Sequence, residues 1–328
     1  MAVGRKLIKS LIIAALSLIV VLGGWAFVAQ PLDLGIQATD LANMVHVDSG
    51  SFRVGKGTYE SGGFWIDQFE VTERNWTKYR QSHGGPALNY PVFEKQRNPD
   101  FPVRWVSYPQ AAAYAASQFK RIPSNLEWER AAQGPSGGRW PWGDRWTAAA
   151  NVAEIWARGK GENRVTRVGL FERGRSPVGT YDMVGNVWEW TSSESSGLLF
   201  GTDDSVKVPD GHGAPVVRGG AFNSARPGSR GKYEKVENSR LTRAWDLGFR
   251  CVISDEEVEF QMVVFPLIRD LGWSDPWHQL IKGRRAAKKL AKLGSKTLPY
   301  LLAVREACRD GDVCDRIESV VTRIRKGS

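Results

Sequence analysis

The chain has 328 residues and a formal net charge of +10; 42% of its residues are hydrophobic and 24% are charged. This length allows one large domain with an appendage or two domains, and the composition excludes an intrinsically disordered chain. The 35 glycines and 14 tryptophans favour an irregular, loop-rich fold with packed indole rings over a helical bundle.

The N-terminal segment, residues 1–30, predicts a membrane anchor. An uncharged apolar stretch from Leu11 to Val28 follows three basic residues. As a helix it would reach about 27 Å, close to the hydrocarbon thickness of a bilayer. The basic flank stays inside, so we expect the rest of the chain to be extracytoplasmic, in the periplasm or at the cell exterior. A protein secreted after cleavage behind Ala29 is the alternative.

Residues 31–43 are predicted to be a linker to a domain at 44–253. This domain opens with strand-like runs. Three N-cap residues then predict helices: Thr72 before Glu73–Arg80, Ser107 before Tyr108–Phe119 and Ser124 before Asn125–Ala132. From there to Val216 the chain is mostly irregular. A stretch of that length needs packed indoles or a bound metal to hold it in place.

Two acidic residues, Asp182 and Glu189, flank a Gly-Asn turn. A loop that folds back on itself can bring both carboxylates to one cation, and backbone carbonyls can complete the flexible oxygen shell that Ca²⁺ accepts. The alternative is a polar turn held by Trp188 and Trp190 without a metal.

Residues 254–328 are predicted to form a helical C-terminal extension, with helices near Phe260–Leu271, Trp277–Leu293, Leu298–Ala307 and Asp315–Lys326. Seven cations follow one another without an intervening acid: Lys282, Arg284, Arg285, Lys288, Lys289, Lys292 and Lys296. Because export argues against nucleic acid, an anionic membrane surface is the candidate partner, and a solvated helix face is the alternative. In an oxidising compartment, a disulfide between Cys308 and Cys314 could close a small loop. The sequence does not show whether the geometry allows this disulfide.

Five motifs, in this order, make the middle domain resemble the formylglycine-generating enzyme (sulfatase-modifying factor) family. They are FEVTE at Phe69–Glu73, RIPSNLEWERAA at Arg121–Ala132 with WPWG after it, YDMVGNVWEW at Tyr181–Trp190, VRGGAF at Val217–Phe222 and LGFRC at Leu247–Cys251. The resemblance implies an α+β fold related to C-type lectins, with little regular secondary structure. It also implies calcium held by Asp182, Gly185, Val187 and Glu189, and a second, weaker calcium site at Asn151 and Val152.

The same resemblance implies that the family's copper chemistry is absent. The enzymes of the family carry two cysteines after the Arg-Gly-Gly strand, and this chain has Ser224 and Ser229 there. A hard, protonated hydroxyl cannot replace a thiolate on soft Cu(I). The four histidines show no paired spacing that would suggest an iron site.

We therefore expect a pseudoenzyme: a membrane-anchored, exported binding or scaffold module with a protein or glycan partner and no nucleic acid. Two alternatives are a metal-dependent oxidoreductase of the same family with a non-copper site, and a structural subunit of a membrane complex. The candidate binding surface combines aromatic and basic side chains: Phe222, Arg226, Arg230, Tyr233, Arg243 and Trp245.

Overall fold

The computed structural model describes residues 39–54, 57–84, 88, 98–153, 164–195, 206–207, 214–224, 234–236, 239–272 and 279–327. The chain divides into two compact units, one formed by Thr39–Glu259 and the other including Phe260–Ser328. The predicted anchor at 1–30 lies outside the described residues. Among the helices that are described, none is long and apolar enough to cross a membrane.

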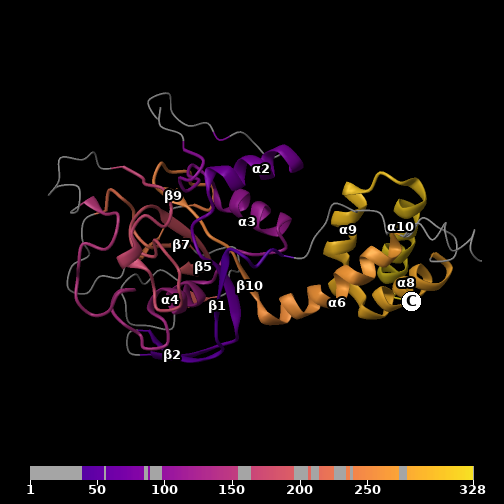
Figure 1. Cartoon of the computed structure of the whole chain (residues 1–328), viewed down its shortest axis with the longest axis horizontal. Coiled ribbons are helices and arrows are strands. Elements are labelled where there is room, and N and C mark those ends of the chain that lie inside the picture. Colours follow the sequence, from indigo (N-terminus) through magenta and orange to yellow (C-terminus); the bar gives the residue numbers. More distant parts are fainter. Residues whose placement is uncertain are drawn as a thin grey trace, which may run out of the picture. The chain divides into compact units, whose positions relative to one another are not determined.

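The first unit is closed by a sheet that joins its two ends. Strands β1 (Met44–Val47), β4 (Phe64–Asp67) and β10 (Val252–Ser254) pair antiparallel in the order β1-β4-β10. The two outer strands of this sheet, β1 and β10, are labelled in Figure 1. Along β4, Phe64 and Ile66 are buried while the residues between and after them are half-buried, as the two-residue period of a strand requires. A hairpin of β2 (Gly50–Val54) and β3 (Gly57–Ser61) lies in the connection between β1 and β4.

A second sheet carries the motif strands in the order β6-β5-β7-β8, and β9 pairs parallel to β5. Its strands are β5 (Trp188–Ser195), β6 (Val206–Lys207), β7 (Ala214–Arg218), β8 (Glu234–Val236) and β9 (Leu247–Gly248). Opposite residues on β5 and β7 include Glu189 and Arg218. Directly opposed side chains of an antiparallel pair project to the same face, so both point into the same part of the interior.

The three predicted helices of this unit are confirmed as α2 (Glu73–His83), α3 (Tyr108–Ser117) and α4 (Asn125–Gln133). Local capping explains where α4 begins. Ser124 Oγ accepts from the backbone N–H of Glu127 at 3.2 Å, and the Glu127 carboxylate accepts from the Ser124 N–H at 2.8 Å. Trp128 and Ala131 of this helix are buried, so α4 is a core helix.

Packed indole rings hold part of the irregular stretch between α4 and β5, whose only described helical turn is η1 (Glu172–Gly174). Trp140 contacts Trp146 edge to face at a centroid distance of 4.8 Å and stacks on Trp142 at 6.0 Å. Such pairs contribute about 0.5–1.5 kcal/mol each beyond the area that they bury. The part of this stretch at 140–146 is therefore held by indole packing, one of the two possibilities that the sequence left open.

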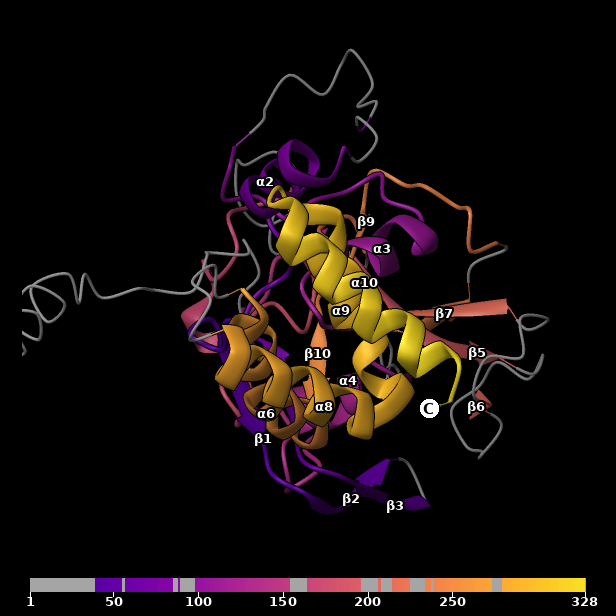
Figure 2. The ribbon, with the colours of Figure 1, turned by 90° about the vertical axis from the view of Figure 1, so that its right-hand side faces the viewer.

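The second unit is helical, as predicted (Figure 2). Its elements are α6 (Asp255–Leu271), which begins in the first unit, η2 (Gln279–Gly283), α8 (Arg284–Leu293), η3 (Gly294–Thr297), α9 (Leu298–Ala307) and α10 (Gly311–Arg325). Helix α10 packs against α8 and α9 through buried aliphatic residues such as Leu290, Val304 and Ile317. A disulfide joins Cys308 to Cys314, across the short connection from α9 to α10.

Two glycines with positive φ give a matched test of close packing in the first unit. Gly185 has a φ of 82°, and a Cβ there would lie 2.2 Å from the carbonyl oxygen of Asn151; Gly84, at the end of α2, has a φ of 66° and open space around it. We expect Gly84→Ala to cost about 1 kcal/mol of unfolding free energy and Gly185→Ala at least about 3 kcal/mol, because strain and overlap add.

Urea unfolding followed by tryptophan fluorescence measures both variants. Equal losses would show that the Gly185–Asn151 contact relaxes at little cost.

Candidate functional site

The motif Tyr181–Trp190 forms a tight turn followed by strand β5. Asp182, Gly185 and Asn186 all have positive φ, at 58°, 82° and 61°. The Gly185 N–H donates to the carbonyl of Gly219 at 2.8 Å, and the Asn186 N–H donates to the carbonyl of Asn151 at 2.9 Å. These bonds hold the turn against two other segments, so the side chains that follow it point into the interior.

Arg250 and Glu189 form an ion pair at the centre of the unit, and both side chains have no exposed surface. Arg250 Nε donates to Glu189 Oε2 and Nη2 to Glu189 Oε1, each at 2.7 Å. The indole of Trp128 donates to Oε2 at 2.8 Å. Arg250 also donates to the carbonyl of Tyr181 at 2.8 Å. Both oxygens of Glu189 are thus occupied by cationic or neutral donors of the protein.

Two further buried carboxyls, Glu70 and Asp182, lie near this pair. Glu70 accepts from the side-chain amide of Asn186 at 2.7 Å and from the N–H of Val187 at 3.2 Å. Burial, together with the nearby negative charges of Asp182 and Glu189, raises the pKa of Glu70 well above its usual range. Burial raises the pKa of Asp182 to about 6, although the Gly169 N–H and Arg250 favour its ionised form. The Arg250 guanidinium is therefore a positive charge that favours the ionised forms of three carboxyl groups, those of Glu70, Asp182 and Glu189.

The predicted calcium ligands Asp182, Gly185, Val187 and Glu189 all belong to this turn and the strand that follows it. Glu189 as placed does not fit a calcium ligand, because its oxygens accept from Arg250 and Trp128 and a fixed positive charge lies beside them. The described residues contain no group of three or more His, Cys, Asp or Glu side chains positioned to hold a metal. Calcium binding at this turn stays a prediction.

The second predicted calcium pair, Asn151 and Val152, is fully buried. The Asn151 side-chain amide donates to the carbonyl of Arg164 at 3.1 Å and to the side chain of Asn186 at 3.0 Å. Thr166 completes this neutral network through its N–H, which donates to Asn186 at 3.0 Å. As placed, the Asn151 side chain ties the turn to a neighbouring loop.

The position that the sequence matched to the first catalytic cysteine, Ser224, lies in the turn after β7. Its Oγ accepts from the N–H of Ala221 at 2.9 Å, and its carbonyl accepts from the N–H of Ala153 at 3.1 Å. The hydroxyl therefore supports its own turn. Ser229 lies outside the described residues.

All three cysteines of the chain are accounted for. Cys308 and Cys314 form the disulfide of the second unit. Cys251 is buried, and its backbone N–H donates to Asp67 at 2.9 Å. Burial, followed by the charge of Asp67, raises the pKa of the Cys251 thiol well above its usual range. None of the three occupies the positions of the family's cysteine pair, which are Ser224 and Ser229 here.

The candidate binding surface is described only in part. Phe222 is buried and contacts Trp245 edge to face at a centroid distance of 5.1 Å, and Trp245 itself is 44% exposed. Arg243, two residues before Trp245, is exposed. Leu241, which the sequence reasoning did not include, is also exposed. The other predicted members, Arg226, Arg230 and Tyr233, lie outside the described residues.

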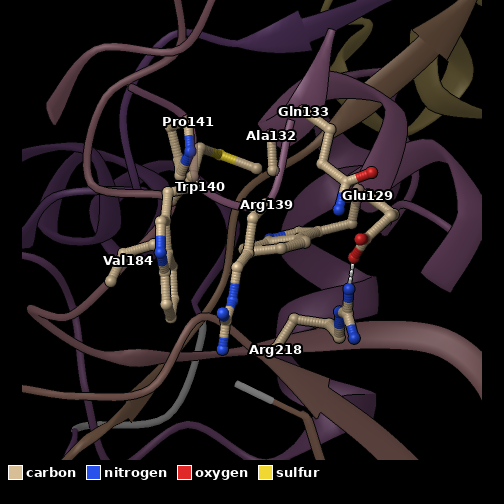
Figure 3. Close-up of a pocket in the computed structure, with 10 residues that line it drawn as sticks. Glu129, Ala132, Gln133, Arg139, Trp140, Pro141, Val184 and Arg218 are labelled. Atoms are coloured by element: carbon tan, nitrogen blue, oxygen red, sulfur yellow. Dashed lines mark ion pairs between the residues drawn. The ribbon is translucent and has the colours of Figure 1, made fainter. Parts of the chain in front are cut away.

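The structure also contains a small pocket that the sequence did not suggest, with a volume of about 30 Å³ (Figure 3). Its wall includes a buried ion pair between Arg218 of β7 and Glu129 of α4. The Arg218 guanidinium also lies over the Trp128 ring at 5.0 Å. Trp140 and Arg139 line another side, as Figure 3 shows. The space is too small for most ligands, so the pair is part of the packed interior.

The profile of the sulfatase-modifying factor enzyme 1-like domain (FGE-sulfatase) matches residues 33–255. The chain belongs to this family. The sequence-based family assignment is therefore confirmed, and the sheets and helices of the first unit are the framework of an FGE-sulfatase domain.

The relatives of this FGE-sulfatase domain include a protein named as an oxygenase and a protein named as an inactive enzyme. Hercynine oxygenase of Mycolicibacterium thermoresistibile is 44% identical over 167 residues, covering 45% of this chain and 36% of that protein. Inactive C-alpha-formylglycine-generating enzyme 2 of Bos taurus is 33% identical over 166 residues, covering 46% of this chain and 50% of that protein. The chain thus spans half or less of the length of these two relatives.

Among solved structures, PvdO from Pseudomonas aeruginosa superposes with a TM-score of 0.52 at 23% identity, covering 64% of this chain and 94% of that chain. This likeness shows the fold.

Sequence reasoning missed the partners of the charged residues. Glu189 was selected as a metal ligand, but nothing in its spacing indicated Arg250, 61 residues away. The pair of Arg218 and Glu129 was missed for the same reason. The one available signal was the family resemblance itself, because each of these residues lies inside one of its motifs.

Removing one partner of the central pair should be costly. We expect Glu189→Gln to lower the unfolding free energy by about 3–5 kcal/mol, because it leaves Arg250 buried without a counter-charge. Asp100→Asn is the matched control, since it breaks the exposed Arg74–Asp100 pair, whose side chains are 53% and 56% exposed. We expect it to cost at most about 1 kcal/mol.

Chemical denaturation of both variants, each against the unmodified chain, checks this expectation. A Glu189→Gln variant no less stable than Asp100→Asn would contradict the central role of the pair.

Proposed function

We propose that this protein is a non-catalytic binding module of the FGE-sulfatase family, exported and held at a membrane. The observation that carries the proposal is that the chain has no cysteine at the positions of the family's cysteine pair and that its three cysteines are bonded or buried elsewhere. Two cysteines are joined to each other, the third is a buried thiol, and Ser224 occupies the described half of the family's cysteine pair. A Cu(I) site of the family type needs thiolate ligands, and the chain has none to offer there.

The Ser224 hydroxyl is also poorly suited to act as a nucleophile. It accepts a backbone hydrogen bond inside its own turn, and no histidine that the structure describes contacts it. His46 instead bonds to Asp255 at 3.1 Å, and His83 bonds to Ser82 at 2.8 Å at the end of α2. Without a neighbouring base, a serine hydroxyl stays protonated and unreactive.

The surface beside the turn has the features of a recognition site. Trp245 is 44% exposed and is held by the Phe222 ring, while Leu241 is 72% exposed. Arg243 adds a cation between them in sequence. A rigid aromatic side chain with aliphatic and cationic neighbours loses little conformational entropy on binding. A protein or a glycan is the proposed partner.

Localisation at a membrane, with the family domain outside the cytoplasm, is part of the proposal. The apolar segment Leu11–Val28 supports it, with cleavage and secretion as the alternative. The Cys308–Cys314 disulfide agrees with an oxidising compartment. Structural calcium at Asp182 remains part of the proposal to be tested by metal analysis.

A metal-dependent oxygenase is the second candidate, favoured by the 44% identity over 167 residues to a hercynine oxygenase. Elemental analysis of the purified full chain separates the two. The binding module should carry calcium at most, and an oxygenase should carry stoichiometric iron or copper. Loss of fixed partners on removal of residues 254–328 would instead indicate a structural subunit.

Thiol titration tests the sulfur assignment directly. We expect no thiol to react with a disulfide reagent in the native, non-reduced protein, because Cys251 is buried with a raised pKa, and one thiol per chain to react after unfolding in denaturant. The same native protein, given Cu(I), oxygen and a cysteine-containing sulfatase peptide, should produce no aldehyde. Aldehyde formation above a no-protein blank would overturn the non-catalytic reading.

Substitution of the exposed surface tests the binding role. In a quantitative pull-down with the tagged full chain, or on a glycan array, Leu241→Ala with Trp245→Ala should reduce the recovered partner at least about tenfold, the scale of a hot-spot loss. The control pair is Leu170→Ala with Met262→Ala, whose side chains are 43% and 69% exposed elsewhere. It should leave recovery unchanged. Equal recovery with both pairs would exclude this surface.

A further inference from the structure

One face of helix α8 carries five exposed cations: Arg284, Arg285, Lys288, Lys289 and Lys292. The opposite face is buried through Ala286 and Leu290. With 3.6 residues per turn, the five cations fall on one continuous side of the helix. Lys282 before the helix and Lys296 after it extend the run, which contains no acid. We call these seven residues the α8 basic face.

The α8 basic face is unfavourable for the helix that carries it. Arg284 with Lys288, Arg285 with Lys289, and Lys288 with Lys292 are like-charged pairs four residues apart, which destabilise a helix. Within the described part of the chain, none of the five α8 cations forms an ion pair with a carboxylate. Internal stability therefore does not explain this arrangement.

Two exposed aliphatic side chains accompany these cations. Ile281 is 49% exposed one turn before the first arginines, and Leu293 is 36% exposed at the end of the helix, one turn after Lys289. Cations with exposed aliphatic neighbours are typical of helices that lie at a membrane interface, where the charged heads meet lipid phosphates and the apolar groups enter the acyl boundary.

We infer that the α8 basic face is a docking surface for an anionic lipid bilayer. Each Lys or Arg near such a surface contributes to binding, and clusters of four to eight are typical of segments that bind acidic phospholipids. A nucleic acid would meet the same charges but gains nothing from Ile281 and Leu293, and the five α8 cations are accompanied by no aromatic side chain on their helix. The inference does not depend on whether the family domain binds a partner.

The test uses the full chain with an environment-sensitive fluorophore on Leu293→Cys. Cys251 is buried and the other two cysteines are bonded, so the new thiol is the one that reacts. The labelled protein is reconstituted in nanodiscs of phosphatidylcholine alone and of phosphatidylcholine with phosphatidylglycerol. We expect the emission to shift to shorter wavelength in the anionic discs only, and the shift to disappear at about 1 M salt, where charges are screened beyond about 3 Å.

The decisive variant is Arg284→Gln, Arg285→Gln, Lys288→Gln and Lys289→Gln together, which should abolish the shift. Because it removes like-charge repulsion, this variant is not expected to unfold α8, and circular dichroism checks that it does not. The matched control removes four exposed cations of the other unit, Arg53, Lys78, Arg145 and Arg173, and should keep the shift.

Three results would overturn the inference. They are an equal shift in neutral and anionic discs, a shift retained by the α8 variant, and a shift produced by a DNA duplex in place of the anionic discs.

Discussion

The first unit is organised around two buried ion pairs that meet at one tryptophan. Trp128 donates its indole N–H to Glu189, which pairs with Arg250, and its ring lies under Arg218, which pairs with Glu129. Glu189 and Arg218 are also opposite each other on β5 and β7. Helix α4, the central sheet and the segment before β10 are thereby tied to one point. A charge removed from this point leaves its partner desolvated, so the arrangement tolerates little change.

The two buried ion pairs and Trp128 give a physical role to five residues of the family motifs. The five side chains come from four of the five motifs: Trp128 and Glu129 from the helix motif, and Glu189, Arg218 and Arg250 from one strand motif each. The motifs are thus read as pieces of one buried electrostatic network. Glycines with positive φ, such as Gly185, let the chain approach closely enough to build it.

The sequence could predict features that depend on neighbouring residues, but it could not predict the ion pairs between residues that lie far apart in the chain. Ser107 and Ser124 were identified as N-caps because a cap and its partner are three residues apart. The pair of Glu189 and Arg250 spans 61 residues, and no local pattern encodes it. Two acids around a turn therefore suggested a metal, whereas the structure places a guanidinium against one of them. The family resemblance could supply the fold and place these residues in its motifs, but the motifs alone did not show which acid pairs with which arginine.

The separation between this centre and the turn of Ser224 bears on function. The side chains that hold the fold together are buried charges, whereas Ser224 occupies a half-buried turn where it accepts a single backbone hydrogen bond. Exchanging a thiol for a hydroxyl there changes soft-metal chemistry without disturbing any of the buried pairs. A chain can therefore lose the family's copper chemistry and keep the scaffold. The described part of the scaffold is held by buried ion pairs and packed indoles, and this is what the proposed binding role requires.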